Sequence, residues 1–339
     1  MKQQSSTVSR RGFIAGSLCL GAGLGAGSLL QSCTAAPTLT SEVKEINFAL
    51  DWTPNTNHIG LYVAQSQGLY EQAGLKVNIL PAPEDGAEAL VASGGAHFGI
   101  SFQDTLASLL DNNQDMPLCV VSSILQHNTS GIISLAENNI TSPAKMAGHT
   151  YATWEIPIEQ DIVKTCVIDD GGNWDEVSLV PSTVTDELSA LESKQVDCIW
   201  VYEAWAKVKC DLAGLKTNYF SFASINPVFD YFTPLIVGNL NFCSEDVALA
   251  KKFLEVTAQG YLFASEQPDK AAEILLEAVP ELESSLVQTS LKMLAPNFLD
   301  DKGKFGTISK ERWKAFYNWL YEQHLVSHLP ASLGLWDKI

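Results

Sequence analysis

The chain alternates between two kinds of hydrophobic pattern from residue 46 onward. Short continuous apolar runs, typical of buried β-strands, are separated by segments in which apolar residues recur at helical spacing. This alternation predicts a mainly parallel, doubly wound sheet with helices on both faces. The segments expected before residue 126 are strands at 46–50, 76–82, 97–102 and 117–125, and helices at 58–74, 86–95 and 104–113.

The same alternation starts again after a turn-rich stretch near residue 142, which predicts a second α/β unit. An apolar run at 234–242 predicts one more buried strand, and the pattern after it is helical. The second unit is therefore expected to be inserted into the first. Its segments are strands at 149–153, 177–182 and 197–203, and helices at 157–172 and 186–195.

The predicted architecture is an α/β protein of two lobes with a ligand cleft between them. The chain is expected to cross between the lobes near residues 126–135 and 225–235. Open α/β sheets bind ligands beyond the ends of their strands, where this cleft would lie. The expected boundaries are 44–133 for the first part of lobe 1, 134–232 for lobe 2, and 233–339 for the second part of lobe 1 with the C-terminal helices.

Two serines are expected to cap helices near the C-terminus, Ser244 for a helix over 245–265 and Ser309 for a helix over 310–325. The later helix carries an apolar stripe, which predicts that one of its faces is buried in the core. The stripe consists of Trp313, Phe316, Tyr317 and Leu320.

The N-terminal residues 1–33 have the pattern of an export signal. "SRRGFIAG" is a twin-arginine signature, and the apolar run "SLCLGAGLGAGSLL" after it is too short to be taken as a membrane span. "LLQSC" resembles a lipobox, so Cys33 is expected to become the lipid-modified first residue of an extracytoplasmic protein, with residues 34–43 as a tether. The alternative is an N-terminal anchor that is never cleaved.

The charge and the cysteines limit the possible partners. A formal net charge of −18, with basic residues Lys2, Arg10 and Arg11 in the leader, makes nucleic acid and anionic membrane poor partners. The five cysteines beyond the leader have no CxxC spacing and predict neither a zinc site nor a disulfide framework. We expect small buried thiols, with one or two disulfides as the alternative. These cysteines are Cys119, Cys166, Cys198, Cys210 and Cys243.

In lobe 1, the loop "DWTPNTNH" follows the first strand and should face the cleft. Trp52 lacks periodic apolar partners and is expected at the cleft edge. Asn57 either caps the next helix or meets the ligand, and His58 either packs on that helix or presents a ring nitrogen. The third strand leads into "SFQDT", which places Gln103 at a helix N-terminus beside Asp104, for which capping is the better interpretation.

In lobe 2, Trp154 and Glu155 occupy the equivalent position after a strand, in "TWEIPIEQD". The last strand of the lobe leaves through "WVYEAW", where Tyr202 and Glu203 are expected near the cleft and Trp200 in the core.

The candidate cleft residues are rings, amides and carboxylates, and none of the loops named contains lysine or arginine. Such a site suits a flat, nitrogen-bearing molecule that is neutral or cationic. No GxSxG elbow, P-loop or HExxH motif is present, and the six histidines are dispersed. We therefore expect no enzyme activity, no cofactor and no metal.

Four segments, "LDWTPNTNHIGLYVAQSQGLYEQAGLKV", "LVASGGAHFGIS", "ILQHNTSGIISL" and "WEIPIEQDIVK", resemble the solute-binding proteins of ABC importers that are related to thiamine-pyrimidine synthases. The resemblance implies the two-lobed type II periplasmic-binding-protein fold and a monomer that delivers its ligand to an ABC permease with ATPase subunits. The implied ligand is formylaminopyrimidine or hydroxymethylpyrimidine, with riboflavin or an alkanesulfonate such as taurine as alternatives.

The resemblance also implies roles for particular residues. Trp52 matches the family's first-loop aromatic, the segment from Gln126 to Gly131 its hinge, and Tyr202 and Glu203 its second-lobe tyrosine and acid. Together with the loop residues named above, the residues expected to bind the ligand are Trp52, Asn57, His58, Gln103, Gln126, Trp154, Glu155, Tyr202 and Glu203. Eukaryotic synthases of the same fold carry a histidine where His58 stands, so a pyrimidine synthase is an alternative. Their cysteine-rich motif is missing here. A sensor domain that docks on a membrane receptor is a further alternative.

Overall fold

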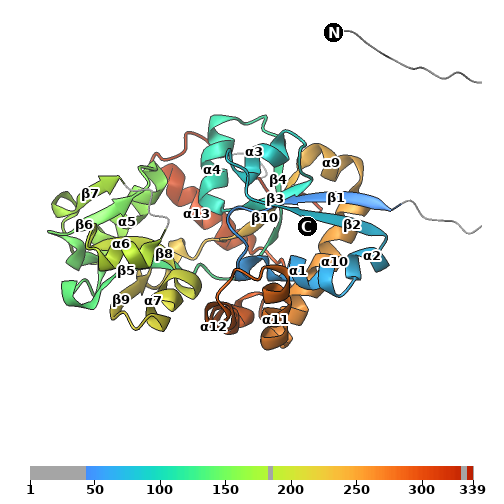
Figure 1. Cartoon of the computed structure of the whole chain (residues 1–339). Coiled ribbons are helices and arrows are strands. Elements are labelled where there is room, and N and C mark those ends of the chain that lie inside the picture. Colours follow the sequence, from blue (N-terminus) through green and yellow to red (C-terminus); the bar gives the residue numbers. More distant parts are fainter. Residues whose placement is uncertain (1–42, 182–185, 330–333, 339) are drawn as a thin grey trace, which may run out of the picture. The chain divides into compact units, whose positions relative to one another are not determined.

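The computed structural model describes residues 43–181, 186–329 and 334–338, which are coloured in Figure 1. The expected leader over residues 1–33, its lipidation site Cys33 and all but the last residue of the tether lie outside the described residues. Two mixed five-stranded sheets form the centres of two α/β lobes, as the alternating pattern predicts.

The sheet of lobe 1 has the order β2-β1-β3-β10-β4. Strand β1 pairs in parallel with β2 and β3, whereas β10 is antiparallel to both of its neighbours, β3 and β4. The antiparallel strand is the one that enters lobe 1 from the other lobe. The bounds are β1 Lys44–Ala49, β2 Leu75–Leu80, β3 Phe98–Ser101, β4 Leu118–Ser123 and β10 Leu235–Asn239.

The sheet of lobe 2 has the order β7-β6-β8-β5-β9, with β5 antiparallel to β8 and β9. Strand β5 lies across the expected boundary at residue 134 and within the segment expected to cross between the lobes. All six of its residues are buried, so it is part of lobe 2 and not of the connection. The bounds are β5 Ser130–Leu135, β6 Thr150–Thr153, β7 Ser178–Pro181, β8 Cys198–Tyr202 and β9 Thr217–Ser221.

Two segments connect the lobes, and we call residues 124–129 the first crossing segment and residues 226–234 the second crossing segment. They lie side by side, since Ile124 N donates to Pro234 O at 3.0 Å and Asn128 Nδ2 donates to Phe229 O at 2.8 Å. The short helix η6, Pro227–Phe229, lies in the second crossing segment.

Most expected helices are present, with shifted ends. The helix expected over 58–74 is broken at Gly68, whose φ of +67° is in the left-handed region that glycine adopts readily. The helices of lobe 1 are α1 Ile59–Ser66, α2 Leu69–Gln72, α3 Ala87–Ala92, α4 Gln103–Asn112, α9 Leu240–Glu245, α10 Val247–Glu266, α11 Pro268–Ala278, α12 Ser284–Leu294 and α13 Lys310–Glu322. Those of lobe 2 are α5 Pro157–Asp169, α6 Glu187–Glu192, α7 Val208–Leu212 and α8 Phe222–Ile225.

Of the two predicted serine caps, one is confirmed. The Ser309 side chain accepts a hydrogen bond from Arg312 N at the start of α13. Ser244 instead lies inside α9 and donates to Leu240 O, and Asp246 caps α10 by accepting from Leu249 N. Serine and aspartate are both good caps, so the sequence pattern did not distinguish them.

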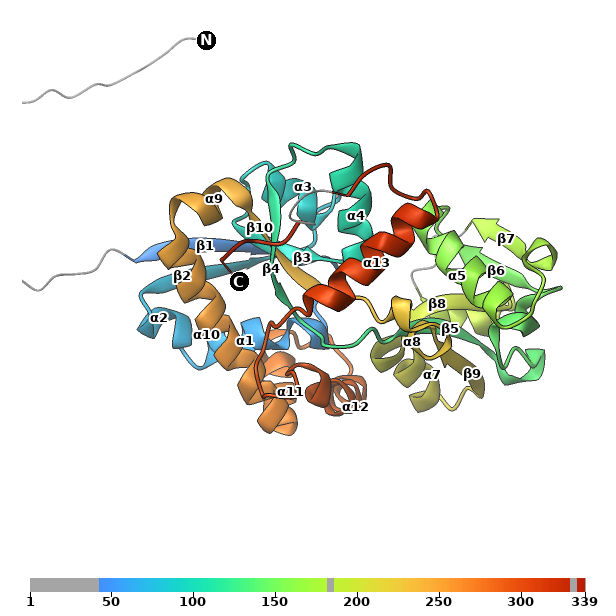
Figure 2. The same ribbon diagram turned by 180° about the vertical axis from the view of Figure 1, so that it is seen from behind.

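The stripe on α13 is buried and joins the two lobes. Trp313, Phe316 and Leu320 belong to a hydrophobic cluster that contains residues from both sheets. The helix runs along the space between the lobes in Figure 2, and Phe316 stacks at 4.1 Å on Tyr231 of the second crossing segment. The expectation that this stripe is core is confirmed.

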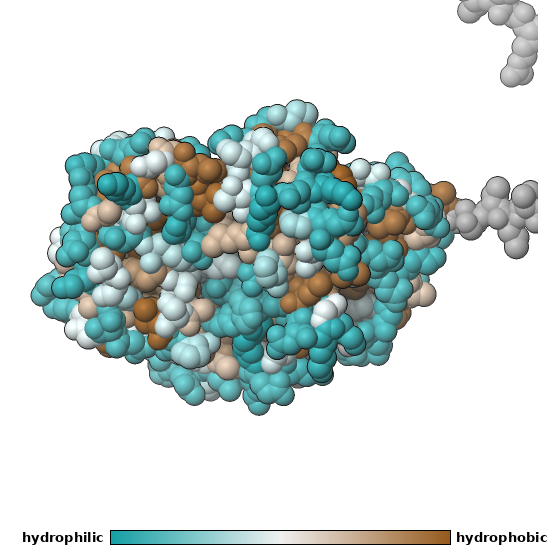
Figure 3. Space-filling model, turned by 90° about the horizontal axis from the view of Figure 1, so that it is seen from below, coloured by the Kyte–Doolittle hydropathy of each residue, from teal (hydrophilic) through white to brown (hydrophobic). Residues whose placement is uncertain are grey.

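The five described cysteines are all buried and unpaired, as the sequence suggests. No helix within the described ranges has the length and hydrophobicity needed to cross a bilayer. Hydrophobic residues on the face seen in Figure 3 are scattered in small separate patches on a mainly hydrophilic surface.

Candidate functional site

A cavity of about 320 Å³ lies between the two lobes. Lobe 1 lines it with the loop after β1, with the residue after β3 and with the end of α12. Lobe 2 lines it with the ends of β6 and β8 and with the π-helix η5, Glu203–Lys207. The lining residues are Asp51, Trp52, Asn55, Thr56, Asn57, Phe102, Thr129, Trp154, Glu187, Trp200, Val201, Tyr202, Ala204, Trp205, Ala206 and Leu294.

The loop after β1 is held firmly against the body of lobe 1. The side chain of Asn55, not that of Asn57 as one interpretation held, caps the short helix η1, Thr56–His58, by accepting from Asn57 N at 2.9 Å. Thr56 Oγ1 lies 2.6 Å from Ser290 Oγ on α12, and Tyr261 Oη donates to Asn57 O at 2.6 Å. Two hydrogen bonds to the body of lobe 1 and one within the loop therefore hold this loop in place.

His58 does not line the cavity, but it bonds to Asp51, which does. Its side chain is fully buried, with Nδ1 accepting from Asn55 N at 3.2 Å and Nε2 lying 2.7 Å from Asp51 Oδ1. Because Nδ1 accepts, the ring proton is on Nε2, which donates to the carboxylate. The prediction that His58 offers a ring nitrogen to the cleft is wrong, since both nitrogens are used internally.

Aromatic side chains from both lobes surround the cavity. Trp52 is 54% exposed and Trp154 is 45% exposed, so both leave large ring surfaces uncovered, and Trp52 lies at the cavity edge as expected. Trp200 is buried, as expected, but also lines the cavity, 5.6 Å from the Trp154 ring. The ring of Phe102 in lobe 1 lies 6.3 Å from that of Tyr202 in lobe 2, at 24°.

Two cavity residues carry a buried polar atom without a hydrogen-bond partner in the described part of the chain. These atoms are the donor Nε1 of Trp200 and the acceptor Oδ1 of Asn57. Buried polar groups in proteins are nearly always paired, so an unpaired donor and an unpaired acceptor beside one cavity favour a ligand that satisfies both. The sequence singled out both residues but could not show that these atoms lack partners.

Among the described residues that line the cavity, the charged side chains are all acidic. Asp51 and Glu187 are these acids, and the described part of the lining contains no lysine, arginine or histidine. Burial raises the pKa of Glu187, and nearby Lys209 partly opposes that shift. The arrangement suits a ligand that donates hydrogen bonds or carries positive charge and disfavours an anion.

Gln103 and Gln126 were predicted to meet a ligand, but neither lines the cavity. Gln103 Nε2 donates to Trp313 O at 3.0 Å and its Oε1 accepts from Phe232 N at 2.9 Å. Gln126 Nε2 donates to Ser123 Oγ and to Thr307 O. Both amides are occupied in joining chain segments, which sequence position alone could not reveal.

Glu155 and Glu203 also do not line the cavity. Glu155 is exposed and has a φ of +60°, while its backbone N–H donates to Thr153 Oγ1. Glu203 begins the π-helix η5, and burial raises its pKa. Asp104, expected to cap α4, is the second residue of that helix and accepts from Tyr231 Oη at 3.3 Å.

Sequence reasoning missed several lining residues, namely Asp51, Phe102, Trp205 and Glu187. The first three lie beside predicted site residues in "DWTPNTNH", "SFQDT" and "WVYEAW", so their loops were identified but the wrong members were chosen. Glu187 carried no signal, because it belongs to an ordinary helical pattern. Within the described residues, no group of three or more His, Cys, Asp or Glu side chains could hold a metal ion.

Known proteins resemble this chain in sequence and in fold. The NMT1/THI5-like family matches residues 55–271. The formylaminopyrimidine-binding protein of Halalkalibacterium halodurans is 29% identical over 303 residues, covering 86% of this chain and 89% of that protein. The 4-amino-5-hydroxymethyl-2-methylpyrimidine phosphate synthase of Legionella pneumophila is 23% identical over 274 residues, covering 77% and 82%.

Among solved structures, the periplasmic aliphatic sulphonate binding protein SsuA of Escherichia coli aligns with a TM-score of 0.70 at 13% identity. The alignment covers 87% of this chain and 98% of that one. This similarity confirms the two-lobed periplasmic-binding-protein fold that the sequence predicts.

Proposed function

The chain belongs to the NMT1/THI5-like family, and on this premise we propose that it is the extracytoplasmic solute-binding protein of an ABC importer. Its ligand is a pyrimidine precursor of thiamine, formylaminopyrimidine or hydroxymethylpyrimidine. The similarity to the formylaminopyrimidine-binding protein of H. halodurans supports this ligand class.

The observation that carries the proposal is the composition of the cavity. Aromatic rings from both lobes surround a space that the described residues line with two acids and no basic side chain. An aminopyrimidine is flat, so it stacks between rings, and its amino group donates to carboxylate and amide oxygens. A sulphonate or nitrate would instead need cationic or N–H donor groups around its oxygens.

Three residues of the cavity contact the polar groups of the ligand in this proposal. Asp51, oriented by His58, accepts from the exocyclic amino group, and Asn57 Oδ1 accepts from a second N–H of the ligand. Trp200 Nε1 donates to a ring nitrogen or to the formyl oxygen. Trp52 of lobe 1 and Trp154 of lobe 2 cover the ligand as the lobes close, and the closed form docks on the permease.

Calorimetric titration of the full chain with five compounds tests the ligand. The compounds are formylaminopyrimidine, hydroxymethylpyrimidine, thiamine, riboflavin and taurine. Binding of one of the two pyrimidines more tightly than the others is the expected result. Binding of taurine alone, or of riboflavin alone, would contradict the pyrimidine assignment.

The proposed location rests on the leader. We propose export by the twin-arginine route and anchoring through a lipid on Cys33, which keeps the protein beside its permease. Metabolic labelling with a fatty acid should mark the natural chain and leave a Cys33→Ala variant unlabelled. Equal labelling of both would reject the lipid anchor.

The similarity to the L. pneumophila synthase favours one alternative, a pyrimidine-forming enzyme. That reaction would consume pyridoxal phosphate and His58 itself, yet this histidine is fully buried and bonded through both ring nitrogens. Incubation with pyridoxal phosphate and iron, followed by mass measurement, distinguishes the two functions. A binding protein keeps its mass, and a loss at His58 would support the enzyme.

A further inference from the structure

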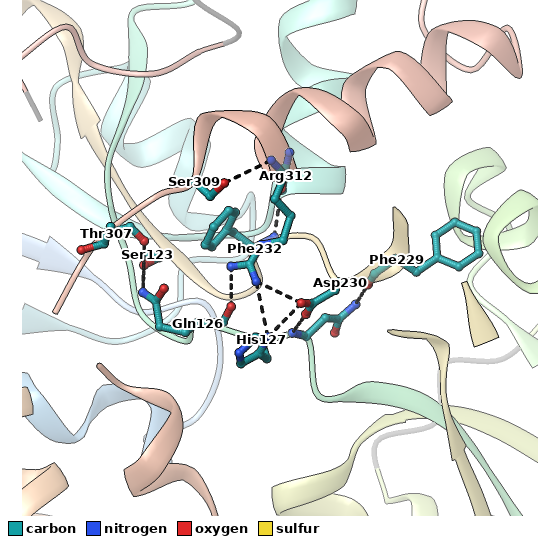
Figure 4. A network of polar contacts seen from close by, with 11 residues as sticks. Ser123, Gln126, His127, Phe229, Asp230, Phe232, Thr307, Ser309 and Arg312 are labelled. Carbon is teal, nitrogen blue, oxygen red and sulfur yellow. Dashed lines mark hydrogen bonds and ion pairs between the residues drawn. The ribbon is translucent and has the colours of Figure 1, made fainter. Parts of the chain in front are cut away.

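The C-terminal helix α13 carries one cationic side chain that contacts both crossing segments. Arg312 Nη1 donates to Asp230 Oδ2 of the second crossing segment at 2.9 Å, and its Nη2 donates to the carbonyl oxygen of Gln126 in the first. The guanidinium also lies 3.9 Å from the centre of the Phe232 ring. Figure 4 shows Arg312 above the two segments, with these partners around it.

Asp230 extends the network along the first crossing segment. Its Oδ1 accepts from Asn128 N at 2.9 Å, and its Oδ2 lies 2.8 Å from His127 Nδ1. Arg312 and Asp230 are 22% and 21% exposed, so their pairing is shielded from water much more than an ordinary surface ion pair. The carboxylate thus binds α13 and the first crossing segment at the same time.

The network reaches the cavity by two short routes, although Arg312 itself does not line it. Asn128 precedes Thr129, which lines the cavity and whose carbonyl accepts from Glu203 N at 2.9 Å at the start of η5. On the other side, Phe232 N donates to Gln103 Oε1, next to Phe102 on the lobe 1 wall. The residues reached belong to opposite walls.

From this geometry we propose that Arg312 is a positioning residue for the cavity. By joining both crossing segments to α13, it sets the spacing of the lobe 1 wall at Phe102 and the lobe 2 wall at Thr129. It thereby limits how far the lobes separate without ligand. Loss of its contacts lets the segments move independently, so that fewer molecules have the walls at the spacing that binds ligand.

Small-angle X-ray scattering of the unliganded full chain tests this without reference to any ligand. Arg312→Met keeps the length of the side chain and removes the charge and the hydrogen bonds. We expect a larger radius of gyration and a broader distance distribution than in the natural chain. Lys314→Met is the matched control, since Lys314 is exposed on the same helix and should give the natural profile.

Two further variants separate positioning from simple loss of folding. Arg312→Lys keeps the charge but cannot span the same partners, and it should give an intermediate profile with an unchanged circular dichroism spectrum. Asp230→Asn removes the charge that pairs with Arg312 but keeps an oxygen that accepts from Asn128 N, so its combination with Arg312→Met should open the molecule little further than Arg312→Met alone. If Arg312→Met fails to fold, the scattering profile of Arg312→Lys alone tests the positioning role. The proposal would be overturned if the folded Arg312 variants gave the same scattering profile as the natural chain.

A second experiment, calorimetric titration with formylaminopyrimidine, rests on the proposed function. We expect about tenfold weaker binding by Arg312→Met and natural affinity in Lys314→Met. If the natural chain does not bind the pyrimidine, the proposed function fails, and scattering still decides the role of Arg312. If the natural chain binds it and Arg312→Met binds equally well, the positioning role is wrong.

Discussion

Phe102 and Tyr202 belong to opposite lobes, and their rings lie 6.3 Å apart at an interplanar angle of 24°. Phe102 follows β3 and Tyr202 ends β8, so the two strands that supply them belong to different sheets. Burial raises the pKa of Tyr202, which keeps its phenol neutral at physiological pH. This pair is a direct contact between the two walls of the cavity.

Removal of the Phe102 ring should weaken ligand binding. Phe102→Ala removes the surface on which Tyr202 stacks, and aromatic pairs contribute about 0.5–1.5 kcal/mol beyond their buried area. We expect up to about tenfold weaker binding of formylaminopyrimidine by calorimetry. Phe102→Leu keeps apolar volume and should lose less. Equal affinities for all three proteins would show that the ring contact does not matter.

The carboxylate of Asp51 should be required for a ligand that bears an amino group. Asp51→Asn keeps the shape and an oxygen that accepts from His58, but removes the charge. Hydrogen bonds to charged groups contribute about 1.5–3 kcal/mol, so binding should weaken at least tenfold. Asp85→Asn removes the same charge from an exposed position outside the cavity. A similar loss in both variants would point to net charge instead of a direct contact.

The exposed tryptophans should contribute stacking energy. Trp154→Ala is expected to cost about 1–3 kcal/mol of binding free energy, by analogy with the stacking of bases on aromatic side chains. Tyr321→Ala removes an exposed ring from α13, outside the cavity, and should leave affinity unchanged. Calorimetric affinities within twofold of each other for Trp154→Ala and the natural chain would contradict a stacking role.

Glu159 should make stability depend on pH. Its carboxylate is buried, accepts from Tyr151 Oη and from Thr153 Oγ1, and so holds the strand that leads to Trp154. Burial raises its pKa above the ordinary value of 4.5, and these hydrogen bonds partly oppose the shift. The folded state therefore binds this proton more tightly than the unfolded state does, and the free energy of unfolding falls as pH rises from 4.5 through the folded pKa.

Glu159→Gln replaces the titratable carboxyl group with an amide, which keeps an oxygen that accepts hydrogen bonds. The free energy of unfolding is measured for both proteins by urea unfolding from pH 4 to 7. The value for the natural chain minus the value for the variant should fall as pH rises. Glu311→Gln, at an exposed site on α13, is the control and should not show this trend. A difference that is constant over the range would mean that Glu159 has no raised pKa.

The sequence by itself determined the class of fold, because alternating apolar periods depend only on which faces of strands and helices are buried. It predicted the strands β1, β3, β6 and β8 that frame the cavity and located the loops at their ends, but it gave no bounds for α12 or for the π-helix η5. It did not identify β9, whose polar and half-buried residues "TNYFS" lack a strong apolar run. The position of β5 was also misjudged, since a buried strand and an extended connection share the same local pattern.

Only the tertiary structure decided which residues of those loops face the cavity. Asp51 and His58 are seven residues apart and bonded to each other, so one faces the ligand space and the other is fully buried. Gln103 and Gln126 lie near the predicted site, but their amides bond to segments more than 100 residues away. Hydrogen-bond partners at such distances are set by the packing of the whole chain, and local sequence contains no record of them.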